Sequence, residues 1–341
     1  MHSKSNARDR FWRCKIASPP AFIDDATISS LLSPADVLSV IAGAFLDPPT
    51  APQRLALQGS DGDGRARALL TMPALREGGL ATVKVVTVLQ GSVSGLSSHL
   101  LAFDPQGELL AVIEAHQLTA LRTAAASILA ARTLGAGGAT RLAVLGAGRQ
   151  ARSHIAAWAD ALPIDSIIVW ARRPEAAEDL VRYASKLCRA RLASDPAEAV
   201  RKAQVVTCAT ASQTPLVLGE DVGRGTHVDL VGGFRPDMRE ADDALIARAL
   251  VVADTPAALL EAGDLTQPIE SKVLDASRVR LLSDVLRGTV RVERSDVTVF
   301  KSVGHAAEDL VVAELLLRRL GLLNLPGVTS KPRLDEASQH E

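Results

Sequence analysis

The stretch Arg141-Leu-Ala-Val-Leu-Gly146-Ala147-Gly148-Arg149-Gln150-Ala151 decides the fold of this chain. It begins with a short apolar run typical of a buried parallel strand, and residues 151–162 continue with helical spacing. Gly146 permits a tight turn, and Gly148 lets the backbone approach a pyrophosphate, which the N–H groups at a helix N-terminus favour. The stretch predicts a dinucleotide-binding turn; the alternative is an ordinary Gly-rich connection between a strand and a helix.

The end of the next expected strand, residues 166–170, indicates which dinucleotide would bind. The chain there reads Trp170-Ala-Arg172-Arg173-Pro, with no acid before Glu175. Sites that prefer NAD usually carry an Asp or Glu here for the ribose 2′-hydroxyl, whereas a 2′-phosphate needs cations. Because two arginines can bind a phosphate through charge-assisted bonds, we expect NADPH, with NADH binding more weakly. The alternative is a solvated arginine pair at the start of a helix.

Length and composition restrict the class of protein. The chain has 341 residues, 47% of them hydrophobic, and a formal net charge of −1. The length predicts two domains, and balanced charge with few aromatic residues argues against a nucleic-acid partner. Cys14, Cys188 and Cys208 show neither a disulfide framework nor a metal-ligand spacing, so no metal is expected. Without an apolar signal segment or a long uncharged apolar run, we expect a cytoplasmic protein with no membrane partner.

Two patterns of secondary structure divide the chain. Residues 24–45 predict helix, with Ser33-Pro34 as a cap and first-turn pair, and strands without intervening helices follow up to residue 114. Residues 118–134 predict an amphipathic helix. Beyond it strands alternate with helices, and the expected strands are 141–145, 166–170, 204–208, 227–231 and 249–253.

This alternation predicts the fold class: α/β, with a Rossmann-type doubly wound parallel sheet plus a second α+β substrate and dimerisation domain. The expected NAD(P)-binding domain covers residues 123–304. The substrate-binding and dimerisation domain would combine residues 1–122 with 305–341, because a last helix at 306–320 is expected to return to it.

Three cations of the first half are candidates for a ligand site: Arg54, Lys84 and Arg122. Strand alternation places Lys84 on one face with Thr82 and Val86, where a charge costs free energy without a partner. The alternative for Lys84 is an edge-strand lysine that reaches solvent. Arg122 lies on an Ala-rich helix, where small neighbours allow a ligand to approach, or where it is simply a surface arginine.

Two later junctions could also bind a ligand. Gly232-Gly-Phe-Arg235-Pro-Asp237 follows an expected strand, and ligands of open α/β sheets bind beyond the carboxyl ends of strands. Charge-rich turns are usually only solvated, so Arg235 and Asp237 stay open. The run Phe300-Lys-Ser302-Val303-Gly304-His305 is a similar junction that could offer N–H groups to a phosphate or carboxylate.

Blocks of distinctive sequence are spaced along most of the chain, from about residue 24 to residue 320. They are Met72-Pro-Ala, Lys84-Val-Val-Thr-Val, Leu118-Thr-Ala-Leu-Arg122-Thr-Ala-Ala-Ala-Ser127, Leu145-Gly-Ala-Gly-Arg-Gln150-Ala-Arg and Phe300-Lys-Ser-Val-Gly304. The Arg-Thr-Ala-Ala block is quite specific. Together the blocks resemble the ornithine cyclodeaminase/mu-crystallin family.

Within that family, two departures separate this chain from the cyclodeaminases. Those proteins have an Asp directly after the Gly-Gly pair and a Gly-Lys downstream, whereas this chain has Phe234 there and no Gly-Lys. They also resemble NAD users with an acid after the second strand, where this chain has Arg172 and Arg173. Arg235-Pro-Asp237 with an NADPH-type arginine pair looks instead like the ketimine and Δ1-pyrroline-2-carboxylate reductases.

The resemblance implies a role for each candidate residue. Arg54, Lys84 and Arg122 would line the substrate pocket and fix a carboxylate. The cofactor-binding residues that it implies are Ser98, Arg122, Gly146, Ala147, Gly148, Arg149, Gln150, Arg172, Arg173, Thr210, Ser302 and Val303. Together with the apolar strands of the first domain, it also indicates a homodimer joined through that domain.

The expected activity is NADPH-dependent reduction of a cyclic imino acid, Δ1-pyrroline-2-carboxylate to L-proline or Δ1-piperideine-2-carboxylate to L-pipecolate. Such a site must clamp the carboxylate, protonate the imine nitrogen and exclude water. Lys84 and Asp237 are the catalytic candidates, and Lys84 is favoured because Asp237 could merely order Arg235. Two alternatives stay open: a cyclodeaminase-type lyase using bound NAD, and a non-catalytic, mu-crystallin-like protein that binds NADPH or another ligand.

Overall fold

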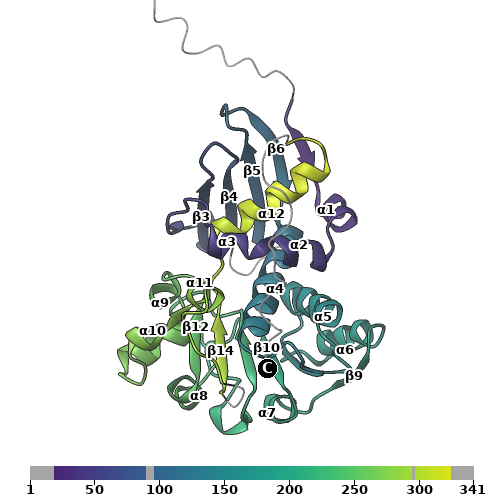
Figure 1. Cartoon of the computed structure of the whole chain (residues 1–341), viewed down its shortest axis with the longest axis vertical. Helices are drawn as coiled ribbons and strands as arrows, with labels where there is room; N and C mark the ends of the chain where they lie inside the picture. The colour runs from purple at the N-terminus through teal and green to yellow at the C-terminus, as the bar shows by residue number, and fades with distance from the viewer. Residues whose placement is uncertain (1–18, 90–95, 294–295, 324–341) are drawn as a thin grey trace, which may run out of the picture.

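The computed structural model describes residues 19–89, 96–293 and 296–323, and contains two β-sheets (Figure 1). The outer segments of the expected division, 1–18 and 324–341, lie outside the described residues. One sheet has six strands and the other has eight. The residues expected to form the site lie at one edge of the eight-stranded sheet and on one face of the six-stranded sheet.

The six-stranded sheet has the order β1-β6-β5-β4-β3-β2. Its strands are β1 (Ala21–Ile23), β2 (Leu55–Ser60), β3 (Ala66–Leu75), β4 (Ala81–Leu89), β5 (Leu96–Phe103) and β6 (Leu109–Glu114). The strands expected between residues 54 and 114 are all present and pair antiparallel. The sheet is not purely antiparallel, however, because β1 joins it parallel to β6. Nothing in the sequence around residue 21 had indicated that strand.

The eight-stranded sheet is parallel throughout and has the order β13-β12-β14-β11-β10-β7-β8-β9. Its strands are β7 (Arg141–Leu145), β8 (Ser166–Trp170), β9 (Arg189–Leu192), β10 (Val205–Cys208), β11 (His227–Leu230), β12 (Leu250–Ala253), β13 (Arg280–Leu281) and β14 (Thr298–Lys301). The five expected strands are all found. The order reverses at β7, which confirms the doubly wound, Rossmann-type sheet.

Helices cover both sheets (Figure 1). They are α1 (Asp25–Leu31), α2 (Pro34–Ile41), α3 (Gly43–Leu46), α4 (Ala115–Thr133), α5 (Arg149–Ala161), α6 (Pro174–Ala184), α7 (Pro196–Arg201), α8 (Asp243–Arg248), α9 (Ala258–Glu261), α10 (Gly263–Glu270), α11 (Leu282–Leu286) and α12 (Ala306–Arg319). The cap expected at Ser33 is confirmed: its side chain accepts a hydrogen bond from the N–H of Asp36, whose carboxylate accepts one from Ser33.

Helix α4 differs from the expectation of an amphipathic helix. Every residue from Ala120 to Ala131 is buried, so the helix has no solvent face over this length. It lies between the two sheets, and the expected domain boundary at residues 122/123 falls within it (Figure 1). A helix enclosed on all sides needs small residues rather than a polar face, which explains its alanine content.

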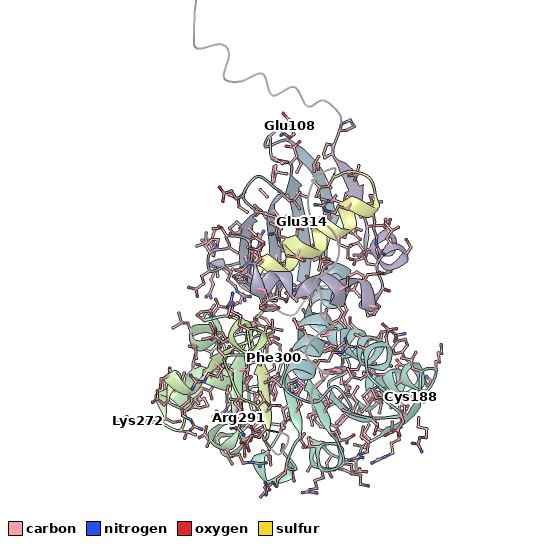
Figure 2. The ribbon with its side chains drawn as sticks, viewed as in Figure 1. Glu108, Cys188, Lys272, Arg291, Phe300 and Glu314 are labelled. Atoms are coloured by element: carbon pink, nitrogen blue, oxygen red, sulfur yellow. The ribbon has the colours of Figure 1, made fainter. Side chains whose placement is uncertain are left out.

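Helix α12 returns to the six-stranded sheet, as expected, and lies across strands β3 and β4 (Figure 1). Its buried leucines share one hydrophobic core with strands of that sheet, α4 and Phe300 of β14 (labelled in Figure 2). This core connects the two sheets physically. Among the described residues no single helix is long and apolar enough to cross a membrane; the bent pair Asp25–Leu31 and Pro34–Leu46 reaches that length and composition only when taken together.

Candidate active site

The Gly146 turn has the geometry that the sequence predicts. Gly146 adopts φ +114°, and a Cβ atom there would lie 2.4 Å from the carbonyl oxygen of Ala209. Any side chain would therefore clash with the loop after β10. The Gly146 N–H donates to the carbonyl of Trp170, at 2.8 Å. The turn is thus held tightly between β8 and β10, as a dinucleotide-binding turn requires.

The start of α5 is suited to an anion. Gly148 is its N-cap, no side chain caps the first turn, and nothing lies within 4 Å of the position that a Cβ would take. Free N–H groups at a helix N-terminus bind phosphate. Gln150 Oε1 in the first turn of α5 is buried and has no hydrogen-bond partner within the described part of the chain, and the same holds for Ser98 Oγ on β5 of the other sheet. The residues at the start of α5 fit a dinucleotide.

The remaining residues expected to bind cofactor lie along one edge of the large sheet. Arg172 and Arg173 follow β8, Thr210 follows β10, and Ser302 and Val303 follow β14. β8 and β10 are the neighbours of β7, β14 is the third strand from it, and their carboxyl ends share one edge because the sheet is parallel. The structure thereby brings together Gly146 and Val303, which are 157 positions apart in the sequence.

A buried carboxylate orders the loop at Thr210. Glu240 accepts hydrogen bonds from the N–H and hydroxyl of Thr210, both at 2.8 Å, and from the N–H of Gly232, at 2.7 Å. Lys301 Nζ and Asp264 lie beside it, 3.2 Å apart and fully buried. Burial raises the pKa of Glu240, while Lys301 opposes that shift. Glu240, Lys301 and Asp264 hold the loops at this edge of the sheet in place, and their own side chains are buried.

Lys84 points to the inner face of the small sheet, where it is almost completely buried. Alternation along β4 buries Thr82, Lys84 and Val86 together, as expected. Lys84 Nζ lies 2.7 Å from Asp309 Oδ2 on α12. Burial lowers the pKa of Lys84 to about 8, although Asp309 works against that change. The edge-lysine alternative is excluded, since 3% of the side chain is exposed.

Arg122 lies beside Lys84 and is buried as well. Its guanidinium is 3.1 Å from Glu308 and 3.3 Å from Asp309. Burial opposes its charge, but the two acids outweigh this effect and raise the pKa of Arg122. It also rests on Gly304, which has φ +78° and where a Cβ would lie 2.6 Å from the guanidinium nitrogens. The surface-arginine alternative for Arg122 is excluded.

Arg54 directly precedes β2, the edge strand of the six-stranded sheet, and contacts the same turn. Its guanidinium donates to the carbonyls of Val303, at 2.6 Å, and Gly304, at 2.9 Å. It also pairs with Glu261 of α9 at 3.0 Å. Asp254 fixes the turn by accepting from the N–H groups of Val303 and Gly304. Arg54, Lys84 and Arg122 therefore gather next to the residues expected to hold the nicotinamide half of the cofactor.

Sequence reasoning missed the buried acids of this cluster. Asp309 and Glu308 lie in the first turn of α12, each 1% exposed, and burial raises the pKa of Glu308 to about 7. Asp254, which orders the turn, was also missed. A signal existed, because a lysine on an inner sheet face demands a buried acid. Sequence alone does not say which of the many acids supplies it.

Asp237 and Arg149 lie away from this cluster. Asp237 is an exposed residue whose carboxylate accepts from Arg235 and Gln213, and these contacts lower its pKa. No contact joins it to Lys84 in the parts of the chain that the structure describes. Asp237 therefore orders Arg235, and its catalytic role stays a prediction. Arg149 is exposed at the start of α5 and lies 3.4 Å from Asp25.

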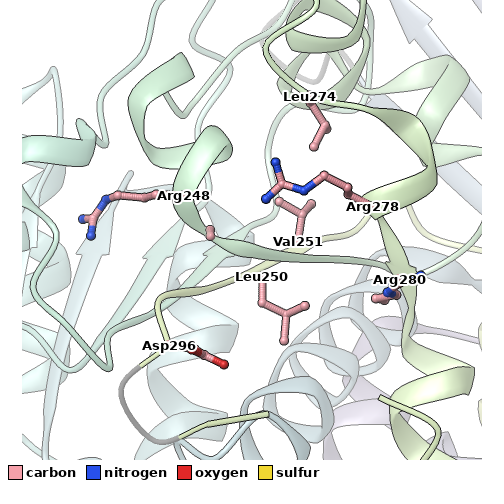
Figure 3. A pocket seen from close by; sticks show the side chains of 8 residues that line it. Arg248, Leu250, Val251, Leu274, Arg278, Arg280 and Asp296 are labelled. Atoms are coloured by element: carbon pink, nitrogen blue, oxygen red, sulfur yellow. The ribbon is translucent and has the colours of Figure 1, made fainter. Parts of the chain in front are cut away.

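A separate pocket lies at the opposite edge of the large sheet (Figure 3). Leu250 and Val251 form its floor where β12 begins, with Arg278 and Arg280 beside them, whereas Arg248 points away. Since the cofactor turn lies at the carboxyl ends of the strands, this pocket is not part of the candidate active site.

Comparison with known proteins agrees with this geometry. Residues 26–320 match the family described as ornithine cyclodeaminase/mu-crystallin. The chain belongs to this family. The family expected from the sequence blocks is thereby confirmed.

Relatives within the family are named as reductases. The chain is 37% identical over 290 residues to a Δ1-pyrroline-2-carboxylate reductase of Paracoccus denitrificans, which covers 82% of this chain and 86% of that protein. It is 38% identical over 242 residues to the ketimine reductase mu-crystallin of Mus musculus, covering 69% and 74%. The Thermococcus litoralis Δ1-pyrroline-2-carboxylate reductase, solved with NADH and L-proline, has a TM-score of 0.81 at 27% identity, covering 88% of this chain and 97% of that one. These names agree with the expected oxidoreductase acting on C=N bonds.

Proposed function

We propose that this protein reduces a cyclic imino acid with NADPH, converting Δ1-pyrroline-2-carboxylate to L-proline and, as a six-membered alternative, Δ1-piperideine-2-carboxylate to L-pipecolate. The observation that carries this proposal is the group of three cations beside the Val303–Gly304 turn: buried Lys84 and Arg122, and partly buried Arg54. It offers cations for a carboxylate at the sheet edge where the dinucleotide-binding turn lies. The named activities of the relatives support the same reaction class.

The reaction adds a proton to the imine nitrogen and a hydride to the carbon. The dinucleotide supplies the hydride when it is bound. Arg122 and Arg54 hold the substrate carboxylate, which turns the C=N carbon toward the hydride donor. Lys84 Nζ gives its proton to the imine nitrogen, and the burial of the cluster excludes water. The lysine then regains a proton from solvent.

The preference for NADPH rests on the end of β8. Arg172 and Arg173 are both exposed there, and the chain has no acid before Glu175. A 2′-phosphate would meet two guanidinium groups, whereas the 2′-hydroxyl of NADH would find no carboxylate partner. NADH should therefore bind more weakly.

The deciding experiment follows the loss of the NADPH absorbance band with Δ1-pyrroline-2-carboxylate, beside parallel reactions with NADH. Oxidation of NADPH that yields proline would support the proposal. Ammonia release from ornithine with NAD, without imine reduction, would instead identify a lyase. Tight NADPH binding with no turnover of either substrate would identify a binding protein.

Lys84→Ala tests the assignment of the proton donor. The variant should lose at least about 100-fold in turnover, the scale of a general acid–base group. Lys186→Ala, which removes an exposed lysine after α6, is the matched control and should keep normal turnover. Near-normal turnover of Lys84→Ala would remove Lys84 from the mechanism.

A further inference from the structure

Asp309 is the acid that joins the two cations of the candidate active site. Its Oδ2 lies 2.7 Å from Lys84 Nζ, and its Oδ1 lies 3.3 Å from Arg122 Nε. Of the described residues, Asp309 is the only acid that forms an ion pair with Lys84. The carboxylate of Asp309 on α12 thus connects β4 and α4, two elements that are far apart in the sequence.

The surroundings of Lys84 would otherwise disfavour its charge. Burial alone drives an ammonium group to release its proton, and Arg122 and Arg54 add positive charge nearby. The lysine stem is also flexible, so an isolated ammonium has no fixed direction. A carboxylate in contact with Lys84 Nζ opposes both effects, because it favours the protonated amine and restricts the motion of the lysine side chain.

We propose that Asp309 is a positioning residue for the reduction: its carboxylate keeps Lys84 charged and holds Lys84 and Arg122 at a fixed spacing before substrate binds. This inference rests on the proposed function. In the proton step, the Nζ–H bond of Lys84 breaks and an N–H bond forms on the imine. Asp309 takes no part in this proton transfer and does not contact the reacting atoms.

Three charged groups act directly on Lys84: Asp309 from α12, Arg122 from α4 and Arg54 from the segment before β2. Glu308 and His305 at the start of α12 and Asp254 after β12 are the further titratable groups of the cluster. Glu308 contacts Arg122 and not Lys84. The effect of Asp309 on Lys84 is therefore separable from that of the second acid.

The test is the pH profile of kcat/KM for Asp309→Asn, a substitution that removes the charge and keeps the shape. Activity that needs protonated Lys84 falls as pH rises, and this alkaline limb should move about 1 to 3 pH units lower in the variant. KM for the imino acid should rise too, because Arg122 loses the ion pair with Asp309 that holds it in position. A merely structural role would lower activity equally at every pH and leave the limb in place.

Glu314→Gln is the matched control. Glu314 lies on the same helix (labelled in Figure 2), is partly buried, and pairs with Arg76 at 2.9 Å outside the site. The alkaline limb of the pH profile of Glu314→Gln should match that of the wild type. A limb that moves equally in both variants would overturn the proposal.

A second readout does not depend on catalysis. In protein carrying 13C-labelled lysine, the Cε signal of Lys84, assigned by its loss in Lys84→Arg, reports protonation directly. Its midpoint should fall in Asp309→Asn, and an unchanged midpoint would overturn the inference even if the wild type proves not to reduce imines. If Asp309→Asn does not fold, Asp309→Glu replaces it as the test variant. Its alkaline limb should stay at the wild-type pH, whereas KM for the imino acid should rise. An unchanged KM would overturn the inference.

Discussion

Under the proposed function, Arg172 and Arg173 are the residues that would distinguish NADPH from NADH. Both are exposed at the end of β8, and neither has an ion pair or side-chain hydrogen bond among the residues that the structure describes. Their guanidinium groups are therefore available. A solvated pair would show the same exposure, so the choice between the two interpretations falls to cofactor kinetics.

Replacing both arginines by alanine should weaken NADPH selectively. A hydrogen bond to a charged group contributes about 1.5–3 kcal/mol, so KM for NADPH should rise roughly 10- to 100-fold while KM for NADH changes little. Steady-state kinetics with each cofactor measures this. Arg182→Ala, which removes an exposed arginine at the far end of α6, serves as control. Equal losses with NADPH and NADH would show that the pair does not bind a 2′-phosphate.

The candidate site shows which residues a sequence can identify. Gly146 and Lys84 were predicted because each violates a local rule: one needs a positive φ, and the other is a charge inside an apolar strand. Asp309 violates no such rule, because an acid in the first turn of a helix is ordinary. Its importance comes from a contact with Lys84, 225 positions away, and only the fold creates that contact.

Among the elements, α4, α5 and β11 are connected by a buried polar network. Ser127 Oγ lies 3.1 Å from His154 Nε2 and 2.9 Å from Asp229 Oδ1, and His154 Nδ1 lies 2.8 Å from the carbonyl of Gln150. His154 donates from Nδ1 to the carbonyl of Gln150, and the Ser127 hydroxyl donates to Asp229 Oδ1. Burial raises the pKa of Asp229 to about 7, although the hydrogen bond from Ser127 opposes that shift. Burial also lowers the pKa of His154 to about 4.

This network predicts a pH-dependent stability. The folded chain keeps the Asp229 proton up to about pH 7, whereas the unfolded chain releases it near 3.8. The stabilisation is therefore present at low pH and lost as pH rises. The unfolding free energy of the wild type should fall relative to Asp229→Asn by about 2 kcal/mol between pH 5 and 7. Urea unfolding at several pH values measures this difference.

Asp275→Asn is the control for that experiment. Hydrogen bonds from Ser277 lower the pKa of Asp275, so its contribution is lost only as pH falls below about 4. The difference between wild type and this variant should stay flat from pH 5 to 7. A flat difference for Asp229→Asn as well would contradict the raised pKa of Asp229.

Elements with a local signature were predicted, whereas elements defined by their surroundings were not. The β7–turn–α5 unit has its glycines, its apolar run and its helical spacing within twenty residues, and it is found as expected. The three-residue β1 has no such pattern and exists because β6 offers it an edge. Helix α4 was assigned the right residues but the wrong environment, because its sequence does not reveal that the second sheet covers its other side.

At the scale of the whole molecule, the outer face of the six-stranded sheet is apolar, and no helix of the described residues covers it. Register places one row of side chains across five strands on this face: Phe22, Val112, Leu101, Val83 and Pro73. Phe22 is 64% exposed and the others are half-buried. Exposed Leu55 and Leu57 extend the face along β2. An apolar face of this extent is typical of an interaction surface.

We expect this face to join two copies of the chain, since the same surface on both partners gives a closed, two-fold interface. Leu101→Glu places a charge at its centre and should convert the dimer to monomer, as measured by light scattering. Leu187→Glu is the control, because Leu187 is 47% exposed and follows α6, which packs against β8 and β9 of the other sheet. Lys84 lies on the opposite face of β4 from Val83, so the dimer would support the strand that carries the candidate proton donor. A wild type that is monomeric would contradict the interface and leave the apolar face to another partner.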